Sequence, residues 1–260
     1  MPERITCRIK RIVDEGPSAR SLYFESDMRV LPGQFLMVTD YGEGERPFSV
    51  ADSDGSRIVL TIKKMGPFSR RICSKKEGDL LSLRGPFGNP FTPRAGTALL
   101  VGGGAGIAPL YLLARELASA GGRVIVVNGA RVADDLILGA WFGRLNVDYV
   151  ETSEDRGERL TSVQLAGRVM EREKVSVVYA AGPELMMAAL KNILRDIPYE
   201  FSFERYMKCG VGICGSCACD PTGIRVCVEG PVFGREQIEK LSDFGVYKRD
   251  ATGARVYFKK

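Results

Sequence analysis

The chain has 260 residues, with 37 Lys and Arg against 32 Asp and Glu, and it contains no histidine. At roughly 100 to 200 residues per domain, this length predicts two domains or one large one. An ordinary content of apolar and charged residues excludes the fibrous and disordered classes. The lack of histidine excludes Ser-His-Asp and Cys-His nucleophiles, His-ligated zinc and His-ligated haem. We therefore expect the chemistry to reside in a bound cofactor that the protein positions.

Charge and hydropathy argue against nucleic acids and membranes as binding partners. The net charge of +5 is small and both signs are interspersed, which argues against nucleic-acid binding. The uncharged stretch 95–114 is long enough to cross a bilayer, but its central glycines and Pro109 favour a strand, a turn and a helix. The first residues lack the apolar stretch of a signal peptide. We expect a cytoplasmic protein that binds no membrane, with seven cysteines used for metal or redox chemistry.

The first third of the chain is typical of a β domain. From residue 5 to residue 91, short alternating or apolar runs are broken by turn residues such as Asp14-Glu15-Gly16-Pro17. Six runs predict six antiparallel strands closed as a barrel or sandwich, with one short helix near residues 69–74. The Pro- and Gly-rich segment 90–96 marks a boundary, so the first domain is expected to span residues 1–93.

Residues 94–200 alternate between strands and helices, which predicts βαβ units and a parallel sheet with covered faces. Strands are expected at residues 98–101, 123–129, 147–152 and 176–182, and helices at residues 110–120, 134–142, 162–173 and 184–193. Residues 201–234 are rich in Cys and Gly, and a polar tail of unknown role, residues 235–260, ends the chain.

Four cysteines near the end of the chain follow the spacing C-x4-C-x2-C, and nine residues then separate the third from the fourth. This is the plant-type spacing for a 2Fe-2S cluster. Three ligands would come from one tight loop and the fourth from a following turn or hairpin, while interleaved glycines let backbone N–H groups face the sulfurs. The predicted iron ligands are Cys209, Cys214, Cys217 and Cys227.

Other interpretations of the cysteines compete with this one. Zinc sites more often use paired C-x2-C units, and here only Cys214 and Cys217 form one. Simple buried thiols would not need the interleaved glycines. Cys219 is the rival for the fourth ligand position, and we prefer Cys227 because a ligand two residues from Cys217 would strain the loop.

A glycine turn follows the first strand of the α/β region and opens a helix. Backbone amides at such a helix start suit a pyrophosphate group. The turn departs from G-x-G-x-x-G, because the third glycine position holds Ile107 when counted from Gly102 and Pro109 when counted from Gly104. The next strand ends in Asn128-Gly129, so it offers no carboxylate to bind a ribose. It therefore indicates either a nucleotide site or a tight packing turn.

Together with the stretch Arg46-Pro47-Phe48-Ser49, these motifs resemble the ferredoxin-NADP reductase superfamily, in which R-x-[YF]-[ST] binds flavin and GGGxGxxP marks the nicotinamide domain. The domain order and C-terminal cysteines are similar to the electron-transfer subunits of type B dihydroorotate dehydrogenases. The most specific parts are ERYMKCGVGICGSC and the EGPVF that follows Cys227. The resemblance implies an antiparallel Greek-key β-barrel for FAD, a parallel-sheet α/β nucleotide domain and a small 2Fe-2S subdomain.

The resemblance also implies roles for individual residues in flavin binding. Contacts with FAD pyrophosphate, ribityl or ring atoms are implied for Arg46, Pro47, Phe48 and Ser49, and flavin-lining positions for Thr61, Ile62 and Lys63. A phosphate cradle at a helix start is implied for Gly66, Phe68 and Ser69, where Phe68 replaces the second glycine usual in the family.

A nicotinamide dinucleotide, NAD rather than NADP, is implied at the glycine turn. The residues concerned are Gly102, Gly103, Gly104, Gly106 and Pro109, with Gly182 and Pro183 beside the nicotinamide. Ala181 stands where the family commonly has a cysteine.

The implied function is electron transfer without a catalytic acid or base from this chain. A 2Fe-2S cluster passes one electron and a nicotinamide carries two, so a flavin that accepts either belongs between them. Dihydroorotate would be oxidised in a separate flavoprotein subunit, in a heterotetramer of pyrimidine biosynthesis, and electrons would cross the cluster and FAD to NAD. Two alternatives stay open: a hydrogenase or ferredoxin-NADP transhydrogenase subunit, and a non-catalytic zinc-binding interaction module.

Overall fold

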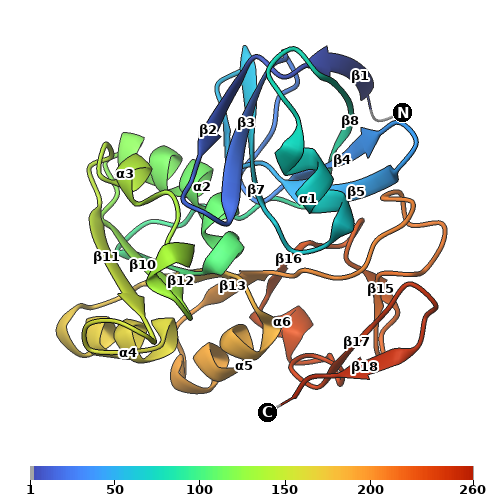
Figure 1. Ribbon diagram of the computed structural model, residues 1–260. Coiled ribbons are helices and arrows are strands. Elements are labelled where there is room, and N and C mark those ends of the chain that lie inside the picture. The colour runs from blue at the N-terminus through green and yellow to red at the C-terminus, as the bar shows by residue number, and fades with distance from the viewer. Residues whose placement is uncertain (1–2, 260) are drawn as a thin grey trace.

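The computed structural model describes residues 3–259 and joins an antiparallel β domain to an α/β domain (Figure 1). Two four-stranded antiparallel sheets form the β domain, in the orders β1-β8-β4-β5 and β2-β3-β7-β6. The first contains β1 (Glu3–Arg8), β8 (Leu80–Phe87), β4 (Phe35–Asp40) and β5 (Gly44–Ser49). The second contains β2 (Arg11–Asp14), β3 (Ala19–Glu25), β7 (Arg57–Lys63) and β6 (Asp52–Ser53), and α1 (Pro67–Ser74) follows β7. The predicted β domain and its short helix are confirmed.

The expected number of six strands is wrong, because two of the predicted runs each bend into two strands. Buried Ile9 turns the chain from β1 to β2 and donates its N–H to Asp79 O at 2.9 Å. Buried Val50 does the same between β5 and β6, with its N–H on Gln34 O at 3.2 Å. Each corner lets one apolar run contribute to both sheets, which pack around a shared core.

The α/β domain contains a six-stranded sheet in the order β11-β10-β9-β12-β13-β16, with all neighbours parallel except β13 and β16. Its strands are β9 (Ala98–Gly103), β10 (Val124–Ala130), β11 (Asp148–Ser153), β12 (Val177–Ala181), β13 (Tyr199–Ser202) and β16 (Val232–Gly234). Its helices are η1 (Gly104–Ile107), α2 (Ala108–Ser119), η2 (Ala133–Asp135), α3 (Gly139–Phe142), α4 (Ser162–Arg172) and α5 (Glu184–Ile193). The predicted parallel-sheet domain is confirmed.

Alternate residues along the central strands pack on opposite faces of this sheet. Leu99 and Val101 of β9 share a core with α4 and α5, whereas Ala98 and Leu100 share one with α2 and α3. Figure 1 shows these two helix pairs on opposite sides of the sheet. Burial on both faces explains why the strands are continuous apolar runs rather than alternating ones.

The helix expected at residues 134–142 is wrong. Two short turns, η2 and α3, replace it, and Leu138 between them has a left-handed φ of 65°. This kink buries both Ile137 and Leu138, and Asn128 Nδ2 donates to the Ile137 carbonyl at 3.1 Å. Burial of two adjacent apolar side chains therefore outweighs the helical periodicity of this segment.

The cysteine-rich segment and the tail pack against the end of the sheet (Figure 1). They contain β14 (Ala218–Cys219), β15 (Ile224–Arg225), α6 (Arg235–Ile238), β17 (Tyr247–Arg249) and β18 (Arg255–Tyr257). The expected border at residue 200 falls inside β13, and β16, from beyond the cysteines, completes the sheet. Among the helices of residues 3–259, none has the length and apolar character needed to cross a bilayer.

Candidate flavin, nucleotide and cluster sites

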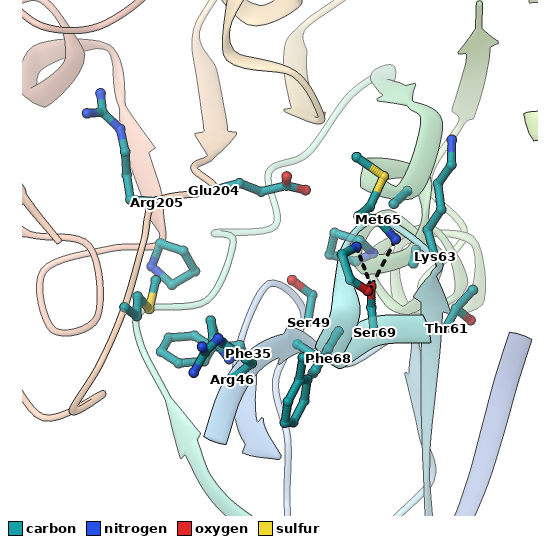
Figure 2. A pocket seen from close by; sticks show the side chains of 18 of the residues that line it. Phe35, Arg46, Ser49, Thr61, Lys63, Met65, Phe68, Ser69, Glu204 and Arg205 are labelled. Atoms are coloured by element: carbon teal, nitrogen blue, oxygen red, sulfur yellow. Dashed lines mark hydrogen bonds between the residues drawn. The ribbon is translucent and has the colours of Figure 1, made fainter. Parts of the chain in front are cut away.

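A cavity of about 550 Å³ lies where the barrel, the glycine turn and the segment after β13 meet (Figure 2). The barrel contributes Phe35, Glu43, Arg46, Pro47, Phe48, Ser49, Thr61, Lys63, Met65, Gly66, Pro67, Phe68 and Ser69. The other walls contribute Ala105, Ala108, Pro109, Phe203, Glu204, Arg205, Met207 and Pro231. This volume is in the range of cofactor pockets, and its walls combine aromatic rings with a few charged groups.

Nearly all barrel residues predicted to contact flavin line this one cavity, although they come from three separate segments. The exception is Ile62, whose side chain is fully buried in the barrel core. Since neighbouring strand residues point to opposite sides, Thr61 and Lys63 face the cavity while Ile62 faces away.

The turn before α1 is shaped by Ser69. Its hydroxyl accepts hydrogen bonds from the backbone N–H groups of Met65 and Gly66, at 2.9 and 3.0 Å, as Figure 2 shows. A Cβ at Gly66 would meet no atom within 4 Å, so the space beside this turn is open. Ser69 therefore fixes the turn, and Gly66 leaves room for a ligand next to it.

In the glycine turn, most glycines are required by packing between protein segments. A Cβ at Gly106 would lie 2.2 Å from the Ala181 carbonyl oxygen, and one at Gly103 would lie 2.9 Å from Pro183 Cδ. A Cβ at Gly102 would clash with Ile107. Gly104 differs, because it has a φ of +54° and open space towards Lys63 Nζ.

The predicted nicotinamide residues lie against this turn. Gly182 has a φ of +148°, and a Cβ on it would come within 3.0 Å of the Gly103 backbone. Pro183 precedes α5 as its cap residue. The structure thus brings Gly182 and Pro183 to the glycine turn, whose Ala105, Ala108 and Pro109 form a wall of the cavity.

An ion pair crosses from the barrel to the α/β domain at the cavity. Lys63 Nζ lies 2.7 Å from Asp135 Oδ2 of η2, and both side chains are largely buried. Burial alone would raise the pKa of Asp135, but hydrogen bonds from Lys63 and Ser18 and the charge of Lys63 lower it overall. This pair links the barrel wall of the cavity to η2 of the α/β domain.

The cysteine loop is built on left-handed glycines. Gly210, Gly212 and Gly215 have φ values of 70°, 78° and 68°, which favour glycine strongly. Backbone N–H groups face two of the sulfurs: Val211 N lies 3.5 Å from Cys209 Sγ, and Cys227 N lies 3.5 Å from Cys217 Sγ. The loop therefore has the N–H to sulfur contacts expected of a cluster-binding loop.

The four predicted ligands influence one another, because Cys214 interacts with Cys209 and Cys217, and Cys227 interacts with Cys217 and Cys209. A hydrogen bond from Ser216 lowers the pKa of Cys214 to about 6. The Cys227 thiol donates to Cys217, which lowers the pKa of Cys217 to about 7 and raises that of Cys227. Low pKa values favour the thiolate, the form that binds metal.

One observation bears on the choice between Cys219 and Cys227 as the fourth ligand. Cys227 is supported as the fourth ligand by its position, because its backbone N–H faces Cys217 Sγ at 3.5 Å, whereas the Cys219 side chain is fully buried beside Arg205.

Sequence reasoning missed the cavity wall formed by Phe203, Glu204, Arg205 and Met207. Figure 2 shows the Glu204 carboxylate pointing into the cavity and the Arg205 side chain pointing away from it. Arg205 Nη2 lies 2.9 Å from Glu184 Oε1, and Nη1 lies 3.0 Å from Asp243 Oδ2 of the tail. No spacing signal marks these residues, because they reach the cavity through the path of β13.

Comparison with solved structures defines the class of protein. The fold superposes on an NADH-dependent reduced ferredoxin-NADP oxidoreductase, studied for flavin-based electron bifurcation, with a TM-score of 0.80, 29% identity and coverage of 92% of this chain and 93% of that chain. Phthalate dioxygenase reductase shares the fold at a TM-score of 0.64 and 19% identity, over 78% of this chain and 70% of that one. The chain has the fold of the ferredoxin-NADP reductase class.

Sequence relatives are more specific. Residues 204–239 match the family model described as the iron-sulfur cluster binding domain of dihydroorotate dehydrogenase B. A probable dihydroorotate dehydrogenase B (NAD(+)), electron transfer subunit, from Methanothermobacter thermautotrophicus is 43% identical, over 95% of each chain. Its counterpart from Methanocaldococcus jannaschii is 34% identical, over 99% of this chain and 100% of that protein. The chain belongs to the family of electron transfer subunits of dihydroorotate dehydrogenase B.

Proposed function

We propose that this chain carries electrons between a 2Fe-2S cluster on Cys209, Cys214, Cys217 and Cys227, FAD in the cavity, and NAD at the glycine turn. The partner would be a catalytic flavoprotein subunit that oxidises dihydroorotate, in a heterotetramer of pyrimidine biosynthesis. One observation carries the proposal: Met207, two residues before Cys209, lines the same cavity as Arg46 of the barrel and Pro109 of the glycine turn. Segments next to each of the three predicted sites therefore border one space, which supports the proposal.

The residues of the cavity suit FAD. When bound, a flavin exchanges either one or two electrons with its neighbours. Arg46 offers a positive charge for the pyrophosphate, and Phe35, Phe48 and Phe68 offer apolar walls for a planar ring system. The 550 Å³ space lies between the barrel and Pro109, so a flavin ring there would separate the cysteine loop from the glycine turn.

The surface around the cysteine loop suits a protein partner. Cys214 is exposed, and its neighbour Ile213 is 86% exposed, although isoleucine is usually buried. Val211 and Val228 on the same loop region are also exposed. Apolar side chains around a redox centre are expected where a partner subunit covers them, because that contact shortens the distance for electron transfer and removes apolar surface from water. We propose that the catalytic subunit docks here.

An anaerobic preparation of the full chain tests the cofactors. We expect two iron atoms and one FAD per chain, a visible spectrum with both flavin and iron-sulfur bands, and a paramagnetic signal of a reduced binuclear centre. NADH should reduce an artificial acceptor, while dihydroorotate should not be oxidised without the partner subunit. A colourless protein that contains zinc would instead support the interaction module.

The identity of the partner needs a separate experiment. The 29% identity to a ferredoxin-NADP oxidoreductase favours, as a second candidate, a transhydrogenase that uses the same cofactors. Affinity purification from the native cell distinguishes the two. Recovery with a dihydroorotate-oxidising flavoprotein supports the first function, and recovery with a ferredoxin-linked subunit or a hydrogenase contradicts it.

A further inference from the structure

Arg46 lies between two aromatic rings that come from different parts of the chain. Its guanidinium carbon is 5.7 Å from the centre of the Phe68 ring of α1. It is 5.9 Å from the centre of the Tyr206 ring, which belongs to the segment leading into the cysteine loop. Both distances are within the range of a cation–π interaction. Phe68 is itself stacked on Phe48, with ring centres 6.1 Å apart, which fixes the plane of its ring.

The charge of Arg46 is not used by a carboxylate of the protein. Among residues 3–259, no Asp or Glu oxygen lies within 4.0 Å of its guanidinium, and its Nη1 donates to the Glu45 backbone carbonyl at 2.8 Å. The neighbouring Glu45 carboxylate instead pairs with Arg84 and Arg4, at 2.6 and 3.0 Å. A guanidinium on the cavity wall that is held by rings rather than by an acid keeps its charge for an anionic ligand.

We propose that Phe68 and Tyr206 are positioning residues, which hold the Arg46 guanidinium towards the pyrophosphate of FAD. The proposal rests on the proposed function, because it takes the cavity to be the FAD site. Tyr206 lies three residues before Cys209, so this contact also makes FAD retention depend on the segment that carries the cysteines. It also gives the ring of Phe68 a role beyond lining the cavity.

The two rings test different parts of this proposal. Phe68 lines the cavity and contacts any ligand in it directly. Tyr206 does not line the cavity, although it faces the same guanidinium. Tyr206 is therefore the more informative position, because the proposal predicts that the effect of its ring on FAD binding depends on Arg46.

The experiment is a double-mutant cycle on the full chain, with the FAD dissociation constant measured from the quenching of FAD fluorescence in the reconstituted apoprotein. We expect Tyr206→Leu to weaken FAD binding about two- to fivefold, the equivalent of about 0.5–1 kcal/mol. Tyr206→Phe should retain wild-type affinity, because the ring rather than the hydroxyl faces Arg46. In an Arg46→Met background, Tyr206→Leu should have no further effect.

Matched controls separate positioning from general damage. Tyr257→Leu removes an exposed ring of the tail and should leave FAD binding unchanged. Melting temperatures of the apoproteins should agree among all variants. An equal loss of affinity from Tyr206→Leu with and without Arg46 would overturn the proposal, and so would no loss in either background. A wild-type chain that does not bind FAD would instead contradict the proposed function.

Discussion

The two glycine-rich loops of this protein use glycine for different physical reasons. In the turn that follows β9, Gly102, Gly103 and Gly106 are required because a Cβ would strike a neighbouring segment. In the cysteine loop, Gly210, Gly212 and Gly215 all have left-handed backbone angles. A Cβ would also lie 2.7 Å from Val228 Cγ2 at Gly212 and 3.0 Å from Met37 Cγ at Gly210, whereas Gly215 has free space around it. In the first loop, glycine lets β9, α2 and the segment after β12 pack closely together. The second is shaped to wrap backbone around a ligand, so its glycines are the more direct indicator of function.

One buried ion network connects the two loops. Glu184 lies two residues after Gly182, which packs on Gly103, and Arg205 lies four residues before Cys209. Asp243 of the tail completes the network, and all three side chains are at most 5% exposed. The tail therefore helps to hold the segment between the nucleotide turn and the cysteines, which gives residues 235–260 a structural role.

The largest effect is expected from the cysteine loop itself. Cys227→Ser should abolish assembly of the 2Fe-2S cluster, because one of the four thiolates is lost. Cys219→Ser should keep the cluster, since Cys219 is not one of the four predicted ligands and its side chain is fully buried beside Arg205. Iron content and the paramagnetic signal of the reduced protein measure the difference. Normal iron in the Cys227 variant, or its loss in the Cys219 variant, would reverse the ligand assignment.

The network that joins the loops comes next. Arg205→Leu should lower the free energy of unfolding by about 3–5 kcal/mol, because it leaves two buried carboxylates without a counter-charge. Arg249→Leu is the control: its partner Asp220 is partly exposed, and this loss should be at most about 1 kcal/mol. Urea unfolding of both variants provides the comparison. Equal small losses would show that the network does not stabilise the junction.

Features that depend on one continuous segment could be predicted from the sequence. Cysteine spacing, the apolar runs of the barrel and the helix at residues 184–193 could all be read locally, and α5 has these bounds. Contacts between distant segments could not be predicted, because no local sequence pattern marks them. The pairing of Ser202 with Val232 brings the chain back to the sheet after the cysteine loop, and it sets the path of residues 203–207 along the cavity.

Within the glycine turn, neighbouring glycines should respond differently. Gly106→Ala would force a Cβ to within 2.2 Å of the Ala181 carbonyl oxygen, which is backbone and cannot move aside easily. We expect a loss of stability of about 3 kcal/mol from this overpacking. Gly104→Ala meets no protein atom closer than 3.8 Å and should cost only the strain of a left-handed alanine, about 1 kcal/mol. Denaturation midpoints of both variants test this, and similar losses would contradict the packing explanation.

The smallest effect is expected at Gly215, and it tests the other half of the comparison. Gly215→Ala adds a methyl group with no atom within 4 Å, so only its φ of 68° matters, at about 1 kcal/mol. Gly215→Asn should cost less, because asparagine adopts left-handed angles more readily than alanine does. If conformation alone governs this loop, iron content should stay normal in both variants and stability should follow the order Gly, Asn, Ala. A larger loss for asparagine than for alanine would show that the side chain meets something, such as the partner subunit or the cluster, that fills the space beside Gly215.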